Sequence, residues 1–267
     1  MKLPQDNLNY PIRIQVANSS GSGFLIKHEN DVYLVTAKHV LFSRNINEAE
    51  RVLISNNARI ICYPRTPAGI AEIPRIYNLN IQDLLNSGDL KAHVSKDLVV
   101  IKIGSLSVNG ENTTLNLVNH VTVVQESGGG LVWYDMVNSR RLAEVEVTNT
   151  VFVLGYPISL STPEMQQIDY DVPLARKGIV AGKNTRNQTV ILDCPVYGGN
   201  SGGLVLEINN NIIHLIGVLV QFIPFVEQWE NKRFPELKNT NLQNSGYSVA
   251  LPVDNIFDLV NRIEEEN

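Results

Sequence analysis

The chain contains 267 residues, of which 43% are hydrophobic and 18% are charged, and its formal net charge is −5. This composition is typical of a globular protein with ample material for a core, and it excludes a disordered chain. The acidic balance gives no electrostatic basis for binding nucleic acid or an anionic membrane, so we expect neither as a partner.

The length fits one large domain or two packed subdomains that share a cleft. The first residues hold no apolar core of the length that a signal peptide needs, and no stretch approaches the ~20 apolar residues of a membrane span. Cys62 and Cys194 are too few for a disulfide framework; they could pair, but two buried thiols fit better. We therefore expect a cytoplasmic protein.

Strand signals recur along almost the whole chain. Short segments rich in Val, Ile, Phe and Tyr are separated by clusters of Gly, Ser, Asn and Asp, and roughly a dozen strands at this spacing predict an all-β barrel or sandwich. The strand-like segments lie at residues 10–16, 24–28, 32–36, 51–55, 58–63, 97–103, 115–124, 130–137, 141–149, 151–156, 178–182, 188–194, 203–208, 212–222 and 247–253.

Helix is scarce. The segment IQDLLNSG predicts one or two helical turns that end at Gly88, and a longer helix is predicted at the C-terminus, with Asp254 as its N-cap. The apolar residues of that last helix share one face at helical spacing: Ile256, Leu259, Val260 and Ile263.

Three polar segments separate the predicted strands. SSGSG, residues 19–23, predicts a turn, and GSLSVNGENTT, residues 104–114, is the weakest internal seam and a candidate joint between two halves. Residues 222–246 predict a long loop, which makes them a candidate for control or partner binding.

The stretch VYGGNSGGLVL, residues 196–206, places four glycines around Ser201. Glycine loses more backbone entropy on folding than other residues, so such a cluster marks unusual dihedrals or a very close approach to the backbone. It predicts either a tight turn between strands or a loop that presents a nucleophile and free backbone N–H groups.

Two further residues stand beside apolar strands, His39 in VYLVTAKHVL and Asp97 in SKDLVVIKI. Considered alone, a histidine like His39 is more often structural than catalytic, and an aspartate that opens a strand, like Asp97, more often satisfies a turn. The order histidine, aspartate, serine, each next to an apolar strand, favours one shared site instead.

The chemistry of acyl transfer needs all three residue types. A serine hydroxyl is a poor nucleophile without an adjacent base, and histidine, with an ordinary pKa near ~6.5, takes and returns its proton. A carboxylate on the far ring nitrogen holds the tautomer. Backbone N–H groups of Gly199, Asn200 and Ser201 would bind the developing oxyanion. Gly202 and Gly203 would keep side chains away from the histidine and the substrate.

These motifs resemble those of the chymotrypsin/trypsin-like serine proteases, in the form common among bacterial members. TAKHV resembles their histidine segment, KDLVVIKI their aspartate strand and GNSGG their nucleophile loop, while GSGFLI, VFVLGYP and GYSVALPVDNIF resemble flanking strands and the terminal helix. The resemblance spans about residues 10–263 and implies two packed six-stranded antiparallel β-barrels with a short C-terminal helix.

The resemblance also implies a function. It identifies the chain as a serine endopeptidase that acts on protein or peptide substrates through an acyl-enzyme, with catalytic residues His39, Asp97 and Ser201 and no cofactor or metal. Residues 1–108 would form the barrel that carries the histidine and the aspartate, and residues 109–267 the barrel that carries the serine.

Substrate contacts are implied by position. The edge strand VLVQF, residues 218–222, would pair with substrate backbone through Val220, Gln221 and Phe222. Pro195 stands where trypsin-like members carry the pocket acid, so with Val196 we expect it to shape a pocket for a small or medium apolar side chain. Glu227 and Glu230 would change this if they reached in.

Other interpretations are weaker. GNSGG also fits the nucleophile elbow of α/β-hydrolases, but the serine is followed by a predicted hairpin and not by a helix. The remaining histidines show no metal-ligand spacing. The open alternative is a latent or catalytically silent module of the protease fold that serves as a binding or scaffold protein and is regulated by a protein partner. The neutral Asn200 before the nucleophile implies that no zymogen activation of the animal type occurs.

Overall fold

Strands make up most of the computed structural model, which describes residues 2–43, 52–66, 69–70, 73–110, 112–157, 169, 171–230, 233 and 238–266. In chain order the elements are η1 (Gln5–Asn9), β1 (Pro11–Val16), β2 (Ser19–His28), β3 (Asp31–Thr36), α1 (Lys38–Leu41), β4 (Phe42–Ser43), β5 (Val52–Leu53), β6 (Asn57–Cys62), β7 (Arg65–Thr66), β8 (Gly69–Ile70), β9 (Arg75–Asn80), α2 (Ile81–Ser87), β10 (Leu90–Ala92), β11 (Val99–Asn109), β12 (Asn112–Leu117), β13 (Val121–Gln125), β14 (Tyr134–Asp135), η2 (Met136–Asn138), β15 (Thr150–Gly155), β16 (Leu174–Asn184), β17 (Thr189–Asp193), β18 (Leu204–Asn209), β19 (Ile212–Glu230), β20 (Lys238–Pro252) and α3 (Val253–Glu266).

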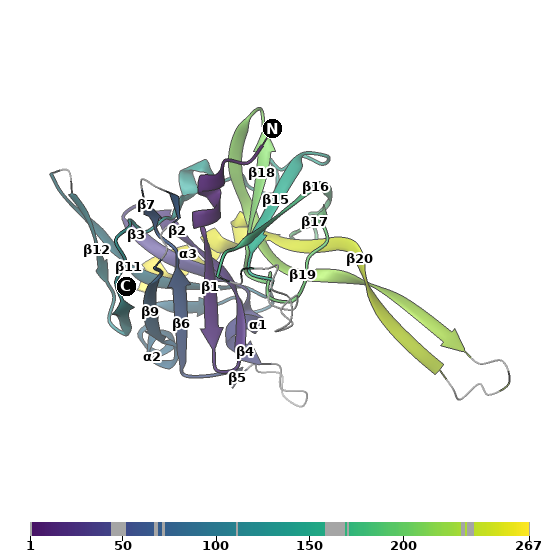
Figure 1. Ribbon diagram of the computed structural model, residues 1–267, viewed down its shortest axis with the longest axis horizontal. Helices are drawn as coiled ribbons and strands as arrows, with labels where there is room; N and C mark the ends of the chain where they lie inside the picture. The colour runs from purple at the N-terminus through teal and green to yellow at the C-terminus, as the bar shows by residue number, and fades with distance from the viewer. Residues whose placement is uncertain are drawn as a thin grey trace.

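The first half of the chain builds one ten-stranded sheet. Its main path runs β10-β11-β3-β2-β1-β6-β9-β13, with β12 paired to β11 and β14 paired in parallel to β2. Over the described residues no pairing joins the two ends of this path, so the predicted closed barrel of six strands does not form here. A bulge between Lys102 and Gly104 bends β11, which continues past the sheet into a hairpin with β12 (Figure 1).

Residues 104–109 and 112–114 of the polar segment belong to the hairpin of β11 and β12 in the first sheet. β13 and β14 also pair with strands of that sheet, and β14 is its last strand in chain order.

The second half closes into a six-stranded barrel with the order β15-β16-β17-β20-β19-β18, as expected for this half. All neighbouring strands in it are antiparallel. Alternate apolar side chains fill the interior, among them Val151, Val153, Val190 and Leu192, which is the period-2 pattern of strands with one face in a core.

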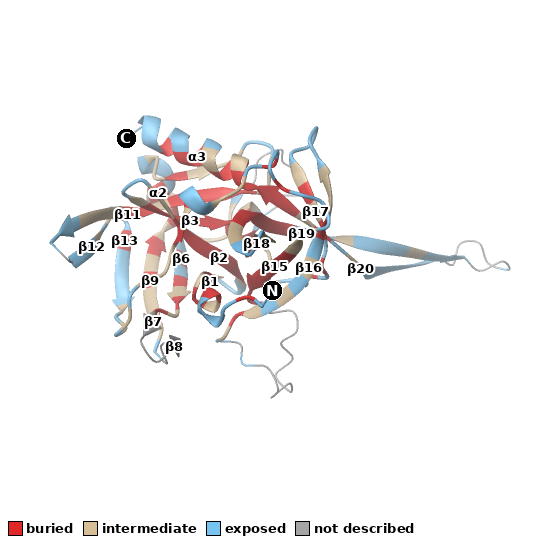
Figure 2. Ribbon diagram, turned by 90° about the horizontal axis from the view of Figure 1, so that it is seen from above, coloured by how far each residue is buried: buried red, intermediate tan, exposed pale blue. Residues whose placement is uncertain are grey.

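Residues 222–246 do not form a loop. In the described part they continue β19 and β20 into a two-stranded arm, with Phe225 opposite Gln243 and Glu230 opposite Lys238. Figure 1 shows this arm projecting far from the body, and Figure 2 shows it exposed along its length while the buried residues gather in the body. Residues 231, 232 and 234–237 lie outside the described part.

The predicted helices are both present. α2 ends at Gly88, whose φ is 88°, and Asn80 caps its N-terminus by accepting a hydrogen bond from the Asp83 N–H. α3 buries its predicted apolar face in the same cluster as the first sheet. Asp254 is not its cap, because α3 begins at Val253 and the Asp254 carboxylate accepts the Leu142 N–H at 2.8 Å. In the parts of the chain that are described, no helix combines the length and the apolar character that crossing a bilayer requires.

Some predicted strands differ in the structure. Residues 141–149 form turns, in which Leu142 and Val145, three apart, both enter the second core. Residues 115–124 are split into β12 and β13 by a turn at His120, whose φ is 72°. SSGSG belongs to β2, and the turn before it lies at Ala17 and Asn18. Both cysteines are buried and unpaired, as expected.

Candidate active site

His39 and Asp97 are brought together by the pairing of β3 with β11. Thr36, the last residue of β3, lies opposite Val99, the first residue of β11, so the segment that follows β3 lies beside the segment that precedes β11. The His39 Nδ1 atom lies 2.6 Å from Asp97 Oδ2, and the His39 backbone N–H donates to Asp97 Oδ1 at 2.9 Å. Asp97 thus holds both the ring and the backbone of the histidine.

This contact assigns the tautomer of His39. A carboxylate oxygen at 2.6 Å from Nδ1 requires a proton on Nδ1, which leaves the lone pair of Nε2 as the acceptor. The His39 side chain is 42% exposed and that of Asp97 is 24% exposed, so solvent and ligand reach the ring.

His93 shapes the turn that presents Asp97. Its Nδ1 atom accepts the N–H groups of Ser95 at 3.2 Å and Lys96 at 3.0 Å, and its carbonyl accepts from Lys38 Nζ at 3.1 Å. Burial, followed by the positive charges of Arg262 and Lys96, lowers the pKa of His93. A neutral ring is the form that these two N–H donors require.

The nucleophile loop approaches other backbone so closely that two of its positions require glycine. A Cβ on Gly202, whose φ is 87°, would lie 2.0 Å from the Ser22 carbonyl oxygen. A Cβ on Gly203 would lie 2.4 Å from the Leu154 carbonyl oxygen. These glycines therefore make room for β2 and β15, and not only for the histidine and substrate as expected.

Ser22 ties the first sheet to the nucleophile loop. Its hydroxyl donates to the Gly199 carbonyl at 2.7 Å and accepts the Tyr156 N–H at 2.8 Å, while its own N–H donates to the Ser201 carbonyl at 3.0 Å. Sequence reasoning missed this residue. The available signal was the alternation of Ser and Gly at residues 20–23, since small residues at alternate positions allow close backbone approach.

Ser201 and its neighbours provide a hydroxyl and two backbone donors. Within the described residues, the Ser201 hydroxyl makes one hydrogen bond, to the Val220 carbonyl at 3.4 Å, and none to His39. The Asn200 N–H, counted among the expected oxyanion donors, donates instead to the Tyr197 carbonyl at 3.1 Å. No acceptor in the described chain engages the N–H groups of Gly199 or Ser201.

One cavity of about 420 Å³ contains the three predicted catalytic residues. Of the predicted substrate contacts it includes Val196, Val220, Gln221 and Phe222, whereas the exposed Pro195 is not part of its lining. Tyr197 and Gly198 complete the lining and were not predicted. Arg176 stacks over the Tyr197 ring at 4.5 Å from its centroid, which supports that wall.

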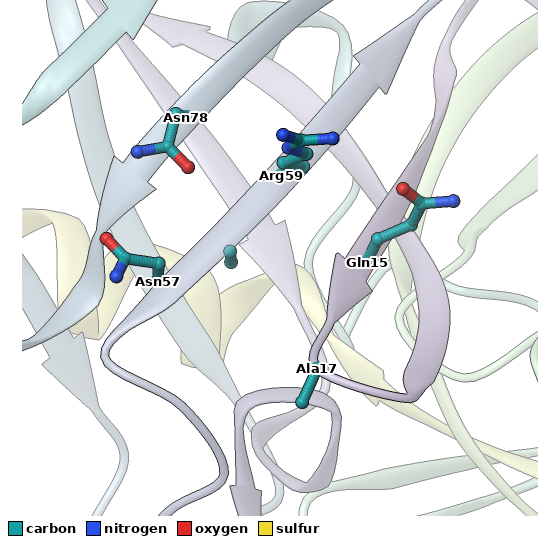
Figure 3. Close-up of a pocket in the computed structure, with 6 residues that line it drawn as sticks. Gln15, Ala17, Asn57, Arg59 and Asn78 are labelled. Carbon is teal, nitrogen blue, oxygen red and sulfur yellow. The ribbon is translucent and has the colours of Figure 1, made fainter.

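A slightly larger hollow of about 480 Å³ lies on the first sheet, across β1, β6 and β9 (Figure 3). It is lined by Gln15, Ala17, Asn57, Ala58, Arg59 and Asn78, a set without a nucleophile or carboxylate. We assign the site to the smaller cavity, because only there do a nucleophile and an oriented base meet. Among the described residues, no group of three or more His, Cys, Asp or Glu side chains is arranged to hold a metal ion.

Comparison with known proteins identifies the family of this chain. Residues 21–218 match the model of the trypsin-like peptidase domain family. A solved structure of the HtrA-type protease AlgW with tripeptide superimposes with a TM-score of 0.50 at 15% sequence identity, over 98% of this chain and 64% of that one. This chain thus spans less than two thirds of that protein, and the likeness shows a common fold. No curated protein sequence matches. Since the family match covers most of the chain, the protein belongs to the trypsin-like peptidase domain family.

Proposed function

We propose that this protein is a serine endopeptidase in which Ser201 is the nucleophile, His39 the general base and Asp97 the group that orients it. The observation that carries the proposal is the 2.6 Å contact of His39 Nδ1 with Asp97, at one cavity with the Ser201 hydroxyl. The two groups that must cooperate come from the first sheet and the second barrel, so the whole chain forms one catalytic unit.

The proposed reaction begins when His39 Nε2 takes the Ser201 hydroxyl proton as Ser201 Oγ attacks the substrate carbonyl carbon. Asp97 stabilises the imidazolium that forms. The imidazolium then protonates the leaving amine, the C–N bond breaks and an acyl-enzyme remains, which water hydrolyses by the same steps in reverse order. The hydroxyl must turn from the Val220 carbonyl to His39, a tightening that substrate binding commonly produces.

The negative oxygen of the tetrahedral intermediate would be bound by the Gly199 and Ser201 N–H groups. Both lie in a loop that Ser22 holds through the Gly199 carbonyl, so the donors are positioned before substrate arrives. Removing one such donor typically costs about 10²–10³ in kcat, a large contribution although a smaller one than the about 10⁴ expected for loss of the Asp97 carboxylate.

We further propose a preference for a small or medium apolar side chain on the amino side of the cut. Val196, Val220 and the half-exposed Phe222 supply apolar walls. The two carboxylates that would oppose this are engaged on the arm, Glu227 with Gln243 at 2.9 Å and Glu230 with Lys238 at 2.7 Å. A peptide library in which cuts after Arg or Lys dominate would contradict the preference.

Labelling with a fluorescent fluorophosphonate tests the proposed function. We expect the purified protein to be labelled and its Ser201→Ala variant to remain unlabelled, because the reagent reacts with a serine only where a base and oxyanion donors are assembled. A folded wild type that is not labelled would favour the alternative, a silent module that acts through a protein partner.

A further inference from the structure

We propose that the arm, defined here as residues 223–230 of β19 and 238–245 of β20, is an extension of the substrate site. The arm binds the segment of an extended polypeptide that lies on the amino-terminal side of the cut. It favours unfolded chains in which this segment carries apolar side chains. This inference rests on the proposed function, since it assigns the substrate class of the same site.

The arm and the cavity are built from one continuous strand. The carbonyl of Val220 contacts the Ser201 hydroxyl, and Gln221 and Phe222 line the cavity. β19 then continues as one strand to Glu230, with one irregularity in its pairing between Phe222 and Pro224. β18 covers the outer edge of β19 only as far as Val218. Leu219 then exchanges backbone hydrogen bonds with Gly202 and Gly203. Beyond Leu219 no strand in the described part of the chain pairs with this edge, so its backbone groups, apart from the missing N–H of Pro224, remain available for an added strand.

The base of the arm is fixed to the wall of the cavity. The Asn244 side-chain amide donates to the Val196 carbonyl at 2.6 Å, and the Ser245 hydroxyl donates to the Ile223 carbonyl at 2.5 Å. These bonds close an irregularity in the pairing between Phe222 and Pro224, where β20 places extra residues and Gly246 has a φ of 87°. The Asn244 bond thereby joins the base of the arm directly to a residue that lines the cavity.

Strand direction decides which part of a substrate meets the arm. β19 runs from the cavity outward, so a substrate that pairs with it in the antiparallel sense runs inward, from the tip toward Ser201. Its residues upstream of the cut therefore lie along the arm. At about 3.4 Å a residue, the edge from Val220 to Glu230 extends for roughly 30 Å and accommodates about ten substrate residues.

One face of the arm supplies apolar contacts at regular intervals. Phe225 and Trp229, four apart on β19 and thus on the same face, are 54% and 65% exposed, and their cross-strand neighbours Gln243 and Asn239 are uncharged. Glu227 lies between them on this face, and its carboxylate accepts a hydrogen bond from the Gln243 amide at 2.9 Å. They would meet substrate side chains about five and about nine residues upstream of the cut. A two-stranded hairpin is only marginally stable in isolation, so a third strand on this edge also stabilises the arm.

Binding to the inactive Ser201→Ala protein tests the arm without relying on catalysis. Two probes are used: a fluorescein-labelled peptide of about twelve alternating leucine and serine residues, and its carboxy-terminal half with the same label. Fluorescence anisotropy measures the binding of each peptide. We expect the long peptide to bind more tightly than the short one and Trp229→Ser to raise the Kd of the long peptide about tenfold. Leu242→Ser is the matched control, because Leu242 is also 65% exposed but lies on the opposite face, beside Val226.

Equal affinity for the two peptides, or equal effects of Trp229→Ser and Leu242→Ser, would overturn the role of the arm. So would a concentration-dependent dimer in sedimentation that Trp229→Ser abolishes, since a second copy would then occupy the arm. Fluorophosphonate labelling of the wild type reports on the proposed function separately: its absence together with length-dependent binding would reject catalysis and retain the binding surface.

Discussion

Replacing Ser22 by alanine should weaken both the fold and the site, although Ser22 lies in a strand of the other half of the molecule. The substitution removes the hydrogen bonds to the Gly199 carbonyl and from the Tyr156 N–H, and the latter lies in a buried region. Two lost hydrogen bonds and one unsatisfied buried donor together cost about 2–3 kcal/mol. For a chain of this length we expect a fall in Tm of about 4–10 °C.

The same change should slow reaction at Ser201. With the Gly199 carbonyl released, the peptide unit between Gly199 and Asn200 can rotate. This rotation changes the dihedral angles that orient the flanking N–H groups of Gly199 and Ser201, and the oxyanion donors lose their alignment. We expect the rate of fluorophosphonate labelling to fall about tenfold, less than the 10²–10³ that complete loss of a donor costs, because Ser22 N–H still holds the Ser201 carbonyl.

Ser20→Ala provides the matched control for this prediction. Ser20 lies on the same strand, and its hydroxyl oxygen is buried without a hydrogen-bond partner among the described residues. Its removal should therefore leave Tm and labelling nearly unchanged. If both alanine variants behave alike in thermal unfolding and in labelling, the tie between Ser22 and the nucleophile loop does not have the role described above.

Three further predictions concern the site. Asp97→Asn should lower kcat for peptide hydrolysis by about 10⁴ because an amide favours the wrong His39 tautomer, and a loss below tenfold would speak against the triad. Gly202→Ala should prevent labelling and lower the yield of folded protein, because its Cβ would meet the Ser22 carbonyl at 2.0 Å and its φ of 87° disfavours a side chain; an alanine variant with wild-type Tm and labelling would contradict this. Because folding lowers the pKa of His93, the unfolded chain binds a proton at this ring more readily than the folded chain does. The stability that the neutral ring contributes is therefore present above its ordinary pKa near ~6.5 and is lost as the pH falls below that value. Urea unfolding at pH 8 and pH 5 should show a smaller loss on acidification in His93→Ala than in the wild type, and equal losses would count against this role.

Local sequence patterns predicted many of the strands and both helices, and the three proposed catalytic residues line one cavity. The segments with strict alternation became strands, the helix with Ile256, Leu259, Val260 and Ile263 on one face was confirmed, and His39, Asp97 and Ser201 lie at one cavity. Patterns of this kind succeed because side-chain burial repeats every two residues in a strand and about every 3.6 in a helix. The segment 141–149 was predicted wrongly because Leu142 and Val145 enter the core from successive turns.

The sequence by itself supplied the residue types on which the proposed chemistry rests, because a glycine-flanked serine, a histidine and an aspartate beside apolar strands are the groups that acyl transfer needs. Only the tertiary structure decided the openness of the first sheet, the tie from Ser22 to the nucleophile loop and the conversion of residues 222–246 from a loop into an arm. These features depend on contacts between residues far apart in the chain, such as Ser22 with Gly199 and Asn244 with Val196, and no local periodicity encodes them.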